Sequence, residues 1–387
     1  MKQSKFLLAA AFSLTVFAGC KKDAGLSDKQ DAEVNLDKNN AGNVFAERGV
    51  SNGHVYTLSN ETTGNKVLEY KRGKDGKLSF SASYPTGGNG SGGGLGNQGA
   101  VIISDENESL LAVNAGSNTI SAFKITENGL ELKSTVSSGG TTPVSITQHG
   151  DIVFVLNAGG DGNISGFRLD DEKLKPIQNS ARSLSSSASG AAQISFVNNG
   201  NDLVITEKAT NKIITYTVSE HGIPGAMHSI TSATPTPFGF AVGRNGNIFV
   251  SEAAGGATDA SAVSSYHINY NGEISLTTGP VPTHQTAACW VVITNNGKYT
   301  YATNTGSNSI SLYNTNNEGS LNLSASVAAS TDAGPIDAAL SKNSKFLYVL
   351  NSMSHSISVY SVNNDGSLNS VQTVAGLMAG DTGLAAW

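Results

Sequence analysis

One pattern occurs seven times along the chain, and this repeat restricts the possible folds more than any other feature. Each copy has a short apolar segment that ends at Asn or Glu, followed by a loop of Gly, Ser and Asn. A segment of alternating apolar and polar residues comes next, as expected for a strand with one buried face. The copies are residues 54–80, 110–132, 152–176, 203–223, 248–276, 299–323 and 346–370.

A dipeptide that ends in glycine closes most copies, for example Asn128-Gly129, Asn271-Gly272 and Asp365-Gly366. Such dipeptides readily adopt the positive φ of a tight hairpin turn. An apolar residue follows within two positions and begins the next strand. Charged residues make up only 14% of the chain, which excludes a helical bundle rich in Glu and Lys and favours short strands joined by tight turns.

The last residue of the apolar segment gives a reference position in every copy. These seven strand-end residues are Asn60, Asn114, Asn157, Glu207, Glu252, Asn304 and Asn351. Neighbours are 43 to 54 residues apart, a spacing typical of one blade of a β-propeller. A β-sandwich lacks so regular a long repeat, and the coils of a β-helix are much shorter. We therefore predict an all-β fold, a single seven-bladed β-propeller over residues 44–387.

The C-terminal segment indicates how the ring closes. Residues 380–387 parallel residues 333–340, which begin the last full copy, but no further copy follows them. We expect this segment to form an inner strand of the first blade, because such pairing covers edges that would otherwise be exposed.

The first twenty residues have the features of an export signal. Lys2 and Lys5 precede an apolar run, residues 6–18, that is too short to span a bilayer. The run ends in Phe-Ala-Gly-Cys at 17–20, which resembles a bacterial lipobox; the resemblance implies cleavage before Cys20 and a lipid on its sulfur. An ordinary signal peptide with a chance cysteine is the alternative. Residues 21–43 are polar and are predicted to be a flexible tether. The expected location is the cell envelope, anchored in the lipid bilayer, with the outer membrane favoured and the propeller facing the periplasm or the surface.

Charge and motif content exclude several functions. The chain has 24 Lys and Arg residues against 30 Asp and Glu, so no basic face for nucleic acid is expected. No pair of histidines has metal-ligand spacing, and we expect neither a metal nor a cofactor. The glycine-rich segment 87–96 lacks the Gly-Lys-Ser/Thr ending and the following helix of a phosphate-binding loop. We interpret it as a loop over one rim of the propeller.

The strand-end residues should lie on one rim of the propeller, near the central channel, because each inner strand leaves that rim and the second strand returns to it. Loops converge there around a pre-formed hole, so this rim is the expected binding site. The expected pairs of inner-strand and strand-end positions are Ala100 with Asn114, Ser145 with Asn157, Gln193 with Glu207, Gly239 with Glu252, Trp290 with Asn304, and Asp337 with Asn351.

Candidate site residues follow from this rim. Glu207 and Glu252, with Asp337, could form an acidic patch for a cation, a basic ligand or proton transfer; alternatively, each glutamate only caps its hairpin. His284 is the candidate base that the sequence offers for proton transfer together with Glu207. Trp290 could stack on a ligand or pack in the core. The expected ligand-binding positions are Gln193, Trp290, Asp337 and Asn304.

The segments 301–311 and 348–360 resemble the YVTN-type repeats of the seven-bladed lactonase family, which includes bacterial 6-phosphogluconolactonase and fungal carboxymuconate cyclase. In that family a blade typically reads Gly-Pro-Arg-His and then Asn-Glu, and the Arg, His and Glu are implied to handle the lactone. Here residues 190–193 read Gly-Ala-Ala-Gln, so Ala192 and Gln193 replace the Arg and the His, while Glu207 matches. Cys289-Trp290 and Ile336-Asp337 hold the same positions in later copies.

Three functions remain open. The first is a non-catalytic lipoprotein that binds a small molecule, a glycan or a protein at the rim; it predicts a concavity with an exposed aromatic residue. The second is a lactonase or related hydrolase with a rearranged site, which needs a proton-transfer group such as His284 near Glu207. The third is a scaffold that binds partners through blade edges or loops, with a channel mouth closed by its own loops.

Overall fold

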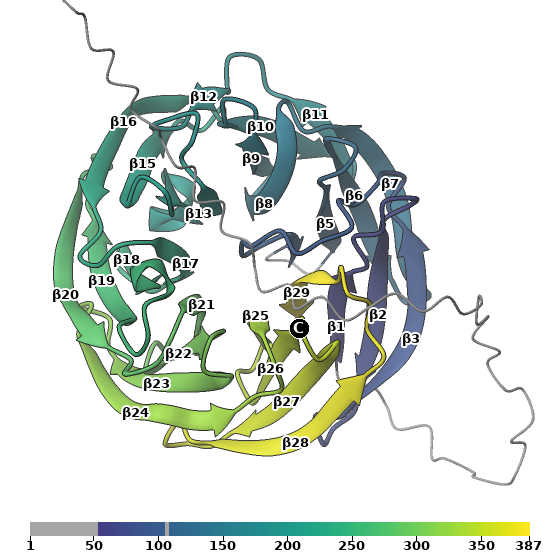
Figure 1. Cartoon of the computed structure of the whole chain (residues 1–387). Coiled ribbons are helices and arrows are strands. Elements are labelled where there is room, and N and C mark those ends of the chain that lie inside the picture. The colour runs from purple at the N-terminus through teal and green to yellow at the C-terminus, as the bar shows by residue number, and fades with distance from the viewer. Residues whose placement is uncertain (1–52, 105–107) are drawn as a thin grey trace, which may run out of the picture. The chain divides into compact units, whose positions relative to one another are not determined.

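In the computed structural model, residues 53–104 and 108–387 are described. The predicted signal sequence, lipidation site Cys20 and tether lie outside these residues. The described residues form seven antiparallel sheets arranged around a central channel, with one innermost strand per sheet (Figure 1). The predicted seven-bladed, all-β architecture is confirmed.

Blades are numbered here in chain order, and their strands run from the channel outward. Blade 1 contains β29 (Thr382–Ala386), β1 (Gly53–Leu58), β2 (Lys66–Arg72) and β3 (Leu78–Pro85). Blade 2 contains β4 (Val101–Ile103), β5 (Ser109–Asn114), β6 (Thr119–Thr126) and β7 (Gly129–Ser137). Blade 3 contains β8 (Thr141–His149), β9 (Ile152–Gly159), β10 (Asn163–Asp170) and β11 (Lys173–Pro176), and the short β12 (Arg182–Ser183) pairs with β10.

The other four blades repeat this order. Blade 4 contains β13 (Ala191–Val197), β14 (Asp202–Glu207), β15 (Lys212–Val218) and β16 (Pro224–Thr231). Blade 5 contains β17 (Pro237–Val242), β18 (Asn247–Glu252), β19 (Ala262–Ile268) and β20 (Ile274–Pro282). Blade 6 contains β21 (Ala288–Ile293), β22 (Tyr299–Asn304), β23 (Ser309–Thr315) and β24 (Leu321–Ser330). Blade 7 contains β25 (Pro335–Leu340), β26 (Phe346–Asn351), β27 (Ser356–Val362) and β28 (Leu368–Ala375). Two short 3-10 helices, η1 (Asn198–Gly200) and η2 (Ala254–Gly256), lie in connecting loops.

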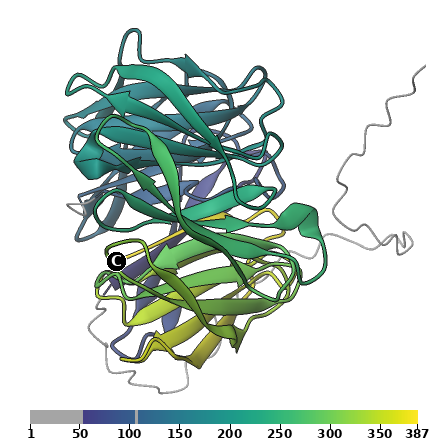
Figure 2. The ribbon, with the colours of Figure 1, turned by 90° about the vertical axis from the view of Figure 1, so that its left-hand side faces the viewer.

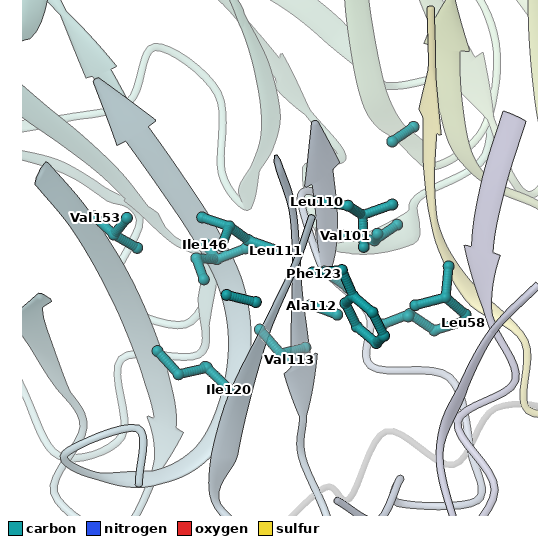
Figure 3. Close-up of a cluster of buried hydrophobic side chains, with 14 of the residues drawn as sticks. Leu58, Val101, Leu110, Leu111, Ala112, Val113, Ile120, Phe123, Ile146 and Val153 are labelled. Atoms are coloured by element: carbon teal, nitrogen blue, oxygen red, sulfur yellow. The ribbon is translucent and has the colours of Figure 1, made fainter. Parts of the chain in front are cut away.

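The core lies between neighbouring blades. Second strands are buried on both faces, and every residue of β5 is buried. Figure 3 shows one cluster of buried apolar side chains, which includes Leu58 of blade 1, Phe123 of blade 2 and Val153 of blade 3. Each such buried side chain stabilises the fold by about 1.5–3 kcal/mol. The repeat therefore fixes the packing of each blade against the next.

The closing strand is where the sequence predicted it. β29 pairs antiparallel with β1, with Val55 opposite Ala386 and Tyr56 opposite Ala385. The last strand of the chain thus becomes the innermost strand of the first blade, beside β25 and near the centre of the ring in Figure 1.

Loops leave the propeller at two opposite faces, as the edge-on view shows (Figure 2). We call the face that holds the strand-end residues the rim face; it carries the connections from second to third strands and from one blade to the next. The opposite face carries the connections from inner to second strands, such as residues 198–201 and 243–246.

The expected pairing of inner-strand and strand-end positions needs a correction. Glu207 lies opposite Ala191, whereas Gln193 lies opposite Thr206. The reason is an irregularity at the start of the inner strand, which adds one residue to that strand and shifts the register. The same shift occurs in blades 3, 5, 6 and 7, so Trp290 lies opposite Thr303 and Asp337 opposite Leu350.

Candidate functional site at the rim of the channel

Three of the five strand-end asparagines cap their own hairpins. Asn114, Asn304 and Asn351 are fully buried, and each side-chain amide donates to a serine seven residues later on the third strand. The donor–acceptor distances are 2.8 Å for Asn114 and 2.9 Å for the other two. Asn304, an expected ligand-binding residue, therefore uses its amide nitrogen inside its own blade.

Glu207 is enclosed by two rim loops. Its carboxylate accepts hydrogen bonds from the backbone N–H of Ser185 at 2.9 Å, from the Ser185 hydroxyl, and from Thr210 Oγ1 at 2.5 Å. The residue has no exposed surface. Its oxygens thus tie the 184–190 loop to the hairpin between β14 and β15.

Glu252 has an even more complete set of donors. Its oxygens accept from the backbone N–H groups of Ala233 and Thr234, both at 3.0 Å. Ser264 Oγ donates at 2.8 Å and Tyr266 Oη at 2.6 Å. Burial raises the pKa of Glu252, while these hydrogen bonds act in the opposite direction. Both glutamates have the geometry of hairpin caps, the alternative that the sequence left open.

Two inner-strand residues join adjacent blades. Gln193 Nε2 donates to the Phe240 carbonyl at 3.0 Å, and the Phe240 N–H donates to Gln193 Oε1 at 2.6 Å. Asp337 is buried and accepts from the backbone N–H of Ala338 at 2.8 Å. Burial raises the pKa of Asp337 well above its usual range, and a backbone hydrogen bond from Leu384 of the closing strand partly opposes this. Gln193 thus links blade 4 to blade 5, and Asp337 links blade 7 to blade 1.

His284 does not meet the glutamates. It lies exposed in the connection between β20 and β21, with a positive φ of 55°. Within the described residues it forms no hydrogen bond or ion pair with Glu207 or Glu252. The structure therefore does not assemble the proton-transfer pair that a lactonase reading of this rim required.

A segment of the glycine-rich loop crosses the channel at this rim. We call residues 95–99 the channel plug. Gln98 Nε2 donates to the Val291 carbonyl at 2.9 Å, and the Val291 N–H donates back to Gln98 Oε1 at 3.2 Å. Gln98 N donates to the Ala192 carbonyl at 3.2 Å, and Ser145 Oγ donates to the Gln98 carbonyl at 2.6 Å. The plug thus leaves blade 1 and binds blades 3, 4 and 6, as the dark blue segment reaching the centre of Figure 1 shows.

Trp290 lies beneath this plug. Its side chain is buried, its ring centroid is 5.0 Å from that of Phe238, and its Nε1 donates to the Asn97 carbonyl at 2.9 Å. Asn97 is also buried, and both polar atoms of its side chain lack a partner within the described residues. Trp290 therefore packs against Phe238, with the two rings tilted by 57°, and holds the plug by a hydrogen bond.

Lys208 is a rim residue that the sequence reasoning missed. Its Nζ donates to the Gly96 carbonyl of the plug at 2.5 Å and lies 4.5 Å from the ring centroid of Phe238. Burial lowers the pKa of Lys208 to about 8. No carboxylate lies within ion-pair distance of it in the described part of the chain. The only signal in the sequence was its place directly after the strand-end Glu207, where most copies have a small residue.

Residues 53–104 and 108–387 lack the features of two other kinds of site. No group of three or more His, Cys, Asp or Glu residues is placed to hold a metal ion. No helix among these residues has the length and apolar character needed to cross a membrane.

Fold and rim together define the class: a seven-bladed β-propeller whose channel is closed on one face by its own loop. The family model described as Lactonase, 7-bladed beta-propeller matches residues 50–187 and 259–386. The chain therefore belongs to this lactonase propeller family, as the repeats predicted.

Solved structures with the same fold include a Bacteroides uniformis protein provisionally named a 6-phosphogluconolactonase. It is 18% identical over 85% of this chain and 98% of its own, with a TM-score of 0.67. The periplasmic gluconolactonase of Pseudomonas aeruginosa is 15% identical over 86% of this chain and 99% of its own, also with a TM-score of 0.67. A protein of unknown function from Desulfotomaculum acetoxidans is 14% identical over 87% and 99%, with a TM-score of 0.68. At these identities the likeness concerns the fold alone. No functionally curated protein matches the chain.

Proposed function

We propose that this chain is a non-catalytic, ligand-binding propeller of the cell envelope, held at the outer membrane by a lipid on Cys20. The observation that carries the proposal is Lys208, a rim cation without a carboxylate partner in the described residues. The plug closes this mouth of the channel, as a scaffold would also have it, and it covers the positions where the family resemblance places Arg and His. The carbonyl of Ala192 accepts from Gln98, and both polar atoms of the Gln193 amide are bonded to Phe240. Neither position offers a cation or a base to a lactone.

The rim nevertheless offers one group to a ligand. Lys208 is a cation without a carboxylate partner in the described residues, and its contact with the Gly96 carbonyl is one that an anion can replace. A carboxylate or phosphate accepts a stronger, charge-assisted hydrogen bond than a carbonyl does. The proposed rim ligand is therefore anionic, with Phe238 beside the charged group.

Binding to the rim is tested by calorimetric titration with 6-phosphogluconate. We expect saturable binding that weakens at least tenfold in Lys208→Gln, since a hydrogen bond to a charged group contributes roughly 1.5–3 kcal/mol. Lys212→Gln is the matched control, because it removes one positive charge from the same hairpin. Equal affinity in wild type and Lys208→Gln would refute the rim site.

A lactonase remains the second candidate, favoured by family membership and by the lowered pKa of Lys208, which makes that amine a usable base near pH 8. Hydrolysis of 6-phosphogluconolactone and simple lactones should stay at background in wild type. Hydrolysis that disappears in Lys208→Met but persists in Lys212→Gln would establish this candidate and overturn the non-catalytic proposal.

The membrane anchor is tested separately. Expression of wild type and Cys20→Ser should give a membrane-bound, acylated protein in the first case and a released, unacylated one in the second. Release of the wild-type protein, or intact-mass data without acyl groups, would refute the anchor.

A further inference from the structure

A cavity lies outside the rim, at the opposite mouth of the channel. It has a volume of about 720 Å³, within the range of small-ligand sites, and lies between the inner ends of blades 2 to 5. A second cavity of about 280 Å³ continues it into the channel and shares Ile102, Ile103, Thr147 and Ser195 with it. The inner cavity reaches Gln98 and Gly99 of the plug. The plug therefore closes one end of the channel, and this cavity is its open end.

The charge of the cavity lining is opposite to that of the chain. The whole chain has a formal net charge of −6, yet the lining contains Arg244 and His149 and no carboxylate. Arg244 Nη2 donates only to the Asn295 carbonyl, at 3.0 Å, and pairs with no carboxylate among the described residues. The nearby Asp202 is fully buried behind Asn198, which donates to its Oδ2 at 2.8 Å. The mouth therefore favours an anionic group, and the planar guanidinium suits a carboxylate.

Tyr270 provides a flat apolar surface at the same mouth. It lies in the hairpin between β19 and β20 and is 84% exposed, the highest value among the large apolar side chains of the described residues. A ring held this openly at the edge of a polar cavity suits stacking against the C–H face of a sugar ring. Deeper in the same cavity Phe196 contributes a second aromatic side chain.

Amide side chains complete the lining. Asn199 and Asn245 lie on the turns of blades 4 and 5, and Gln148 is the next-to-last residue of the inner strand of blade 3. The Oε1 atom of Gln148 is buried without a hydrogen-bond partner in the described structure. Amides both donate and accept, as sugar hydroxyls do, so they can satisfy several hydroxyl groups at once.

We propose that the open mouth of the channel binds an acidic saccharide, with a sugar ring on Tyr270, a carboxylate on Arg244 and hydroxyls on the surrounding amides. This site is separate from the rim: it lies at the other end of the channel and uses none of the rim residues. The proposal therefore stands or falls independently of Lys208 and of any lactone chemistry.

The test is calorimetric titration of the full-length chain in detergent with digalacturonic acid, alongside the neutral disaccharide of galactose with the same linkage. We expect saturable binding of the acid and at least tenfold weaker binding of the neutral sugar, since a hydrogen bond to a charged group contributes roughly 1.5–3 kcal/mol. Arg244→Gln should reduce affinity for the acid to that for the neutral sugar, and Tyr270→Ala should weaken both.

Matched controls separate a site effect from a general one. Lys298→Gln removes a cation from the corresponding turn of blade 6, and Phe80→Ala removes an aromatic ring that is 60% exposed on an outer strand. Both should bind digalacturonic acid like wild type, and thermal melts should show all four variants folded. Three outcomes would each overturn the proposal. They are no saturable binding of the acid, equal binding of the acid and the neutral sugar, and wild-type affinity for the acid in both Arg244→Gln and Tyr270→Ala.

Discussion

Asp381 should make the stability of the closed ring depend on pH. It is 3% exposed and directly precedes the closing strand β29. Its Oδ2 accepts from the Met378 N–H at 3.2 Å, while its Oδ1 has no partner within the described residues. Burial raises the pKa of Asp381 from 3.8 to about 7; the Glu61 carboxylate acts in the same direction, and the Met378 N–H opposes it.

The sign follows from proton linkage. Because the pKa is raised on folding, the folded chain binds more protons than the unfolded chain between these two pKa values, and stability falls as pH rises through that window. The raised pKa of Asp381 should therefore cost about 4 kcal/mol at pH 8, where the buried carboxyl is ionised, and about 1.5 kcal/mol at pH 5, where it must take up a proton on folding. Asp381→Asn removes the charge, so the variant should be more stable than wild type at pH 8 and lose most of that advantage at pH 5.

Urea unfolding followed by circular dichroism at pH 5, 6, 7 and 8 gives the difference in unfolding free energy directly. Asp161→Asn, at an exposed position in the β9–β10 hairpin, serves as the control and should show a difference near zero throughout. A difference between Asp381→Asn and wild type that stays constant over this range would refute the reasoning, because only a titrating group can produce the slope.

Two further variants test the plug and the glutamate caps. A Cβ at Gly239 would lie 2.3 Å from Gln98 Oε1, so Gly239→Ala should displace the plug. In a Trp387→Phe background, we expect red-shifted Trp290 fluorescence and faster protease cleavage within residues 91–96. Unchanged spectra would contradict this. Glu252→Gln replaces an acceptor of four hydrogen bonds by an amide with two donors. It should therefore lower the unfolding free energy by about 2–4 kcal/mol. An effect below about 0.5 kcal/mol in urea titration would show that the cap contributes little.

The repeat predicted the architecture because blade geometry is local. The apolar second strands, the glycine-containing turns and the serine seven residues after Asn114, Asn304 and Asn351 all lie within one copy. The number of blades, the position of the strand-end residues and the closure by β29 could therefore be read from the sequence. Register could not, since the irregular residue at the start of the inner strands of blades 3 to 7 has no fixed sequence signal.

The site was harder to predict because it depends on contacts between distant segments. Gln98 meets Val291, which is 193 residues away, and nothing in a glycine-rich segment indicates that partner. The sequence also did not predict where a side chain points. Glu207 lies at the expected rim, but its carboxylate oxygens accept hydrogen bonds from Ser185 and Thr210. Lys208 was hard to select because its only distinguishing feature is its residue type. Most other copies have a small residue directly after the strand-end position.

The plug and the small residues at the rim, Ala192 and Gly239, fit together. Gln98 contacts the backbone at Ala192 and Val291, and its Oε1 lies where a side chain at position 239 would begin. Ala192 is fully buried, so a long side chain there would overpack its surroundings. An arginine at position 192 would therefore require the residues around this contact to rearrange. With the plug in place, the described residues leave cavity space in the channel toward the opposite mouth, where Arg244 lies.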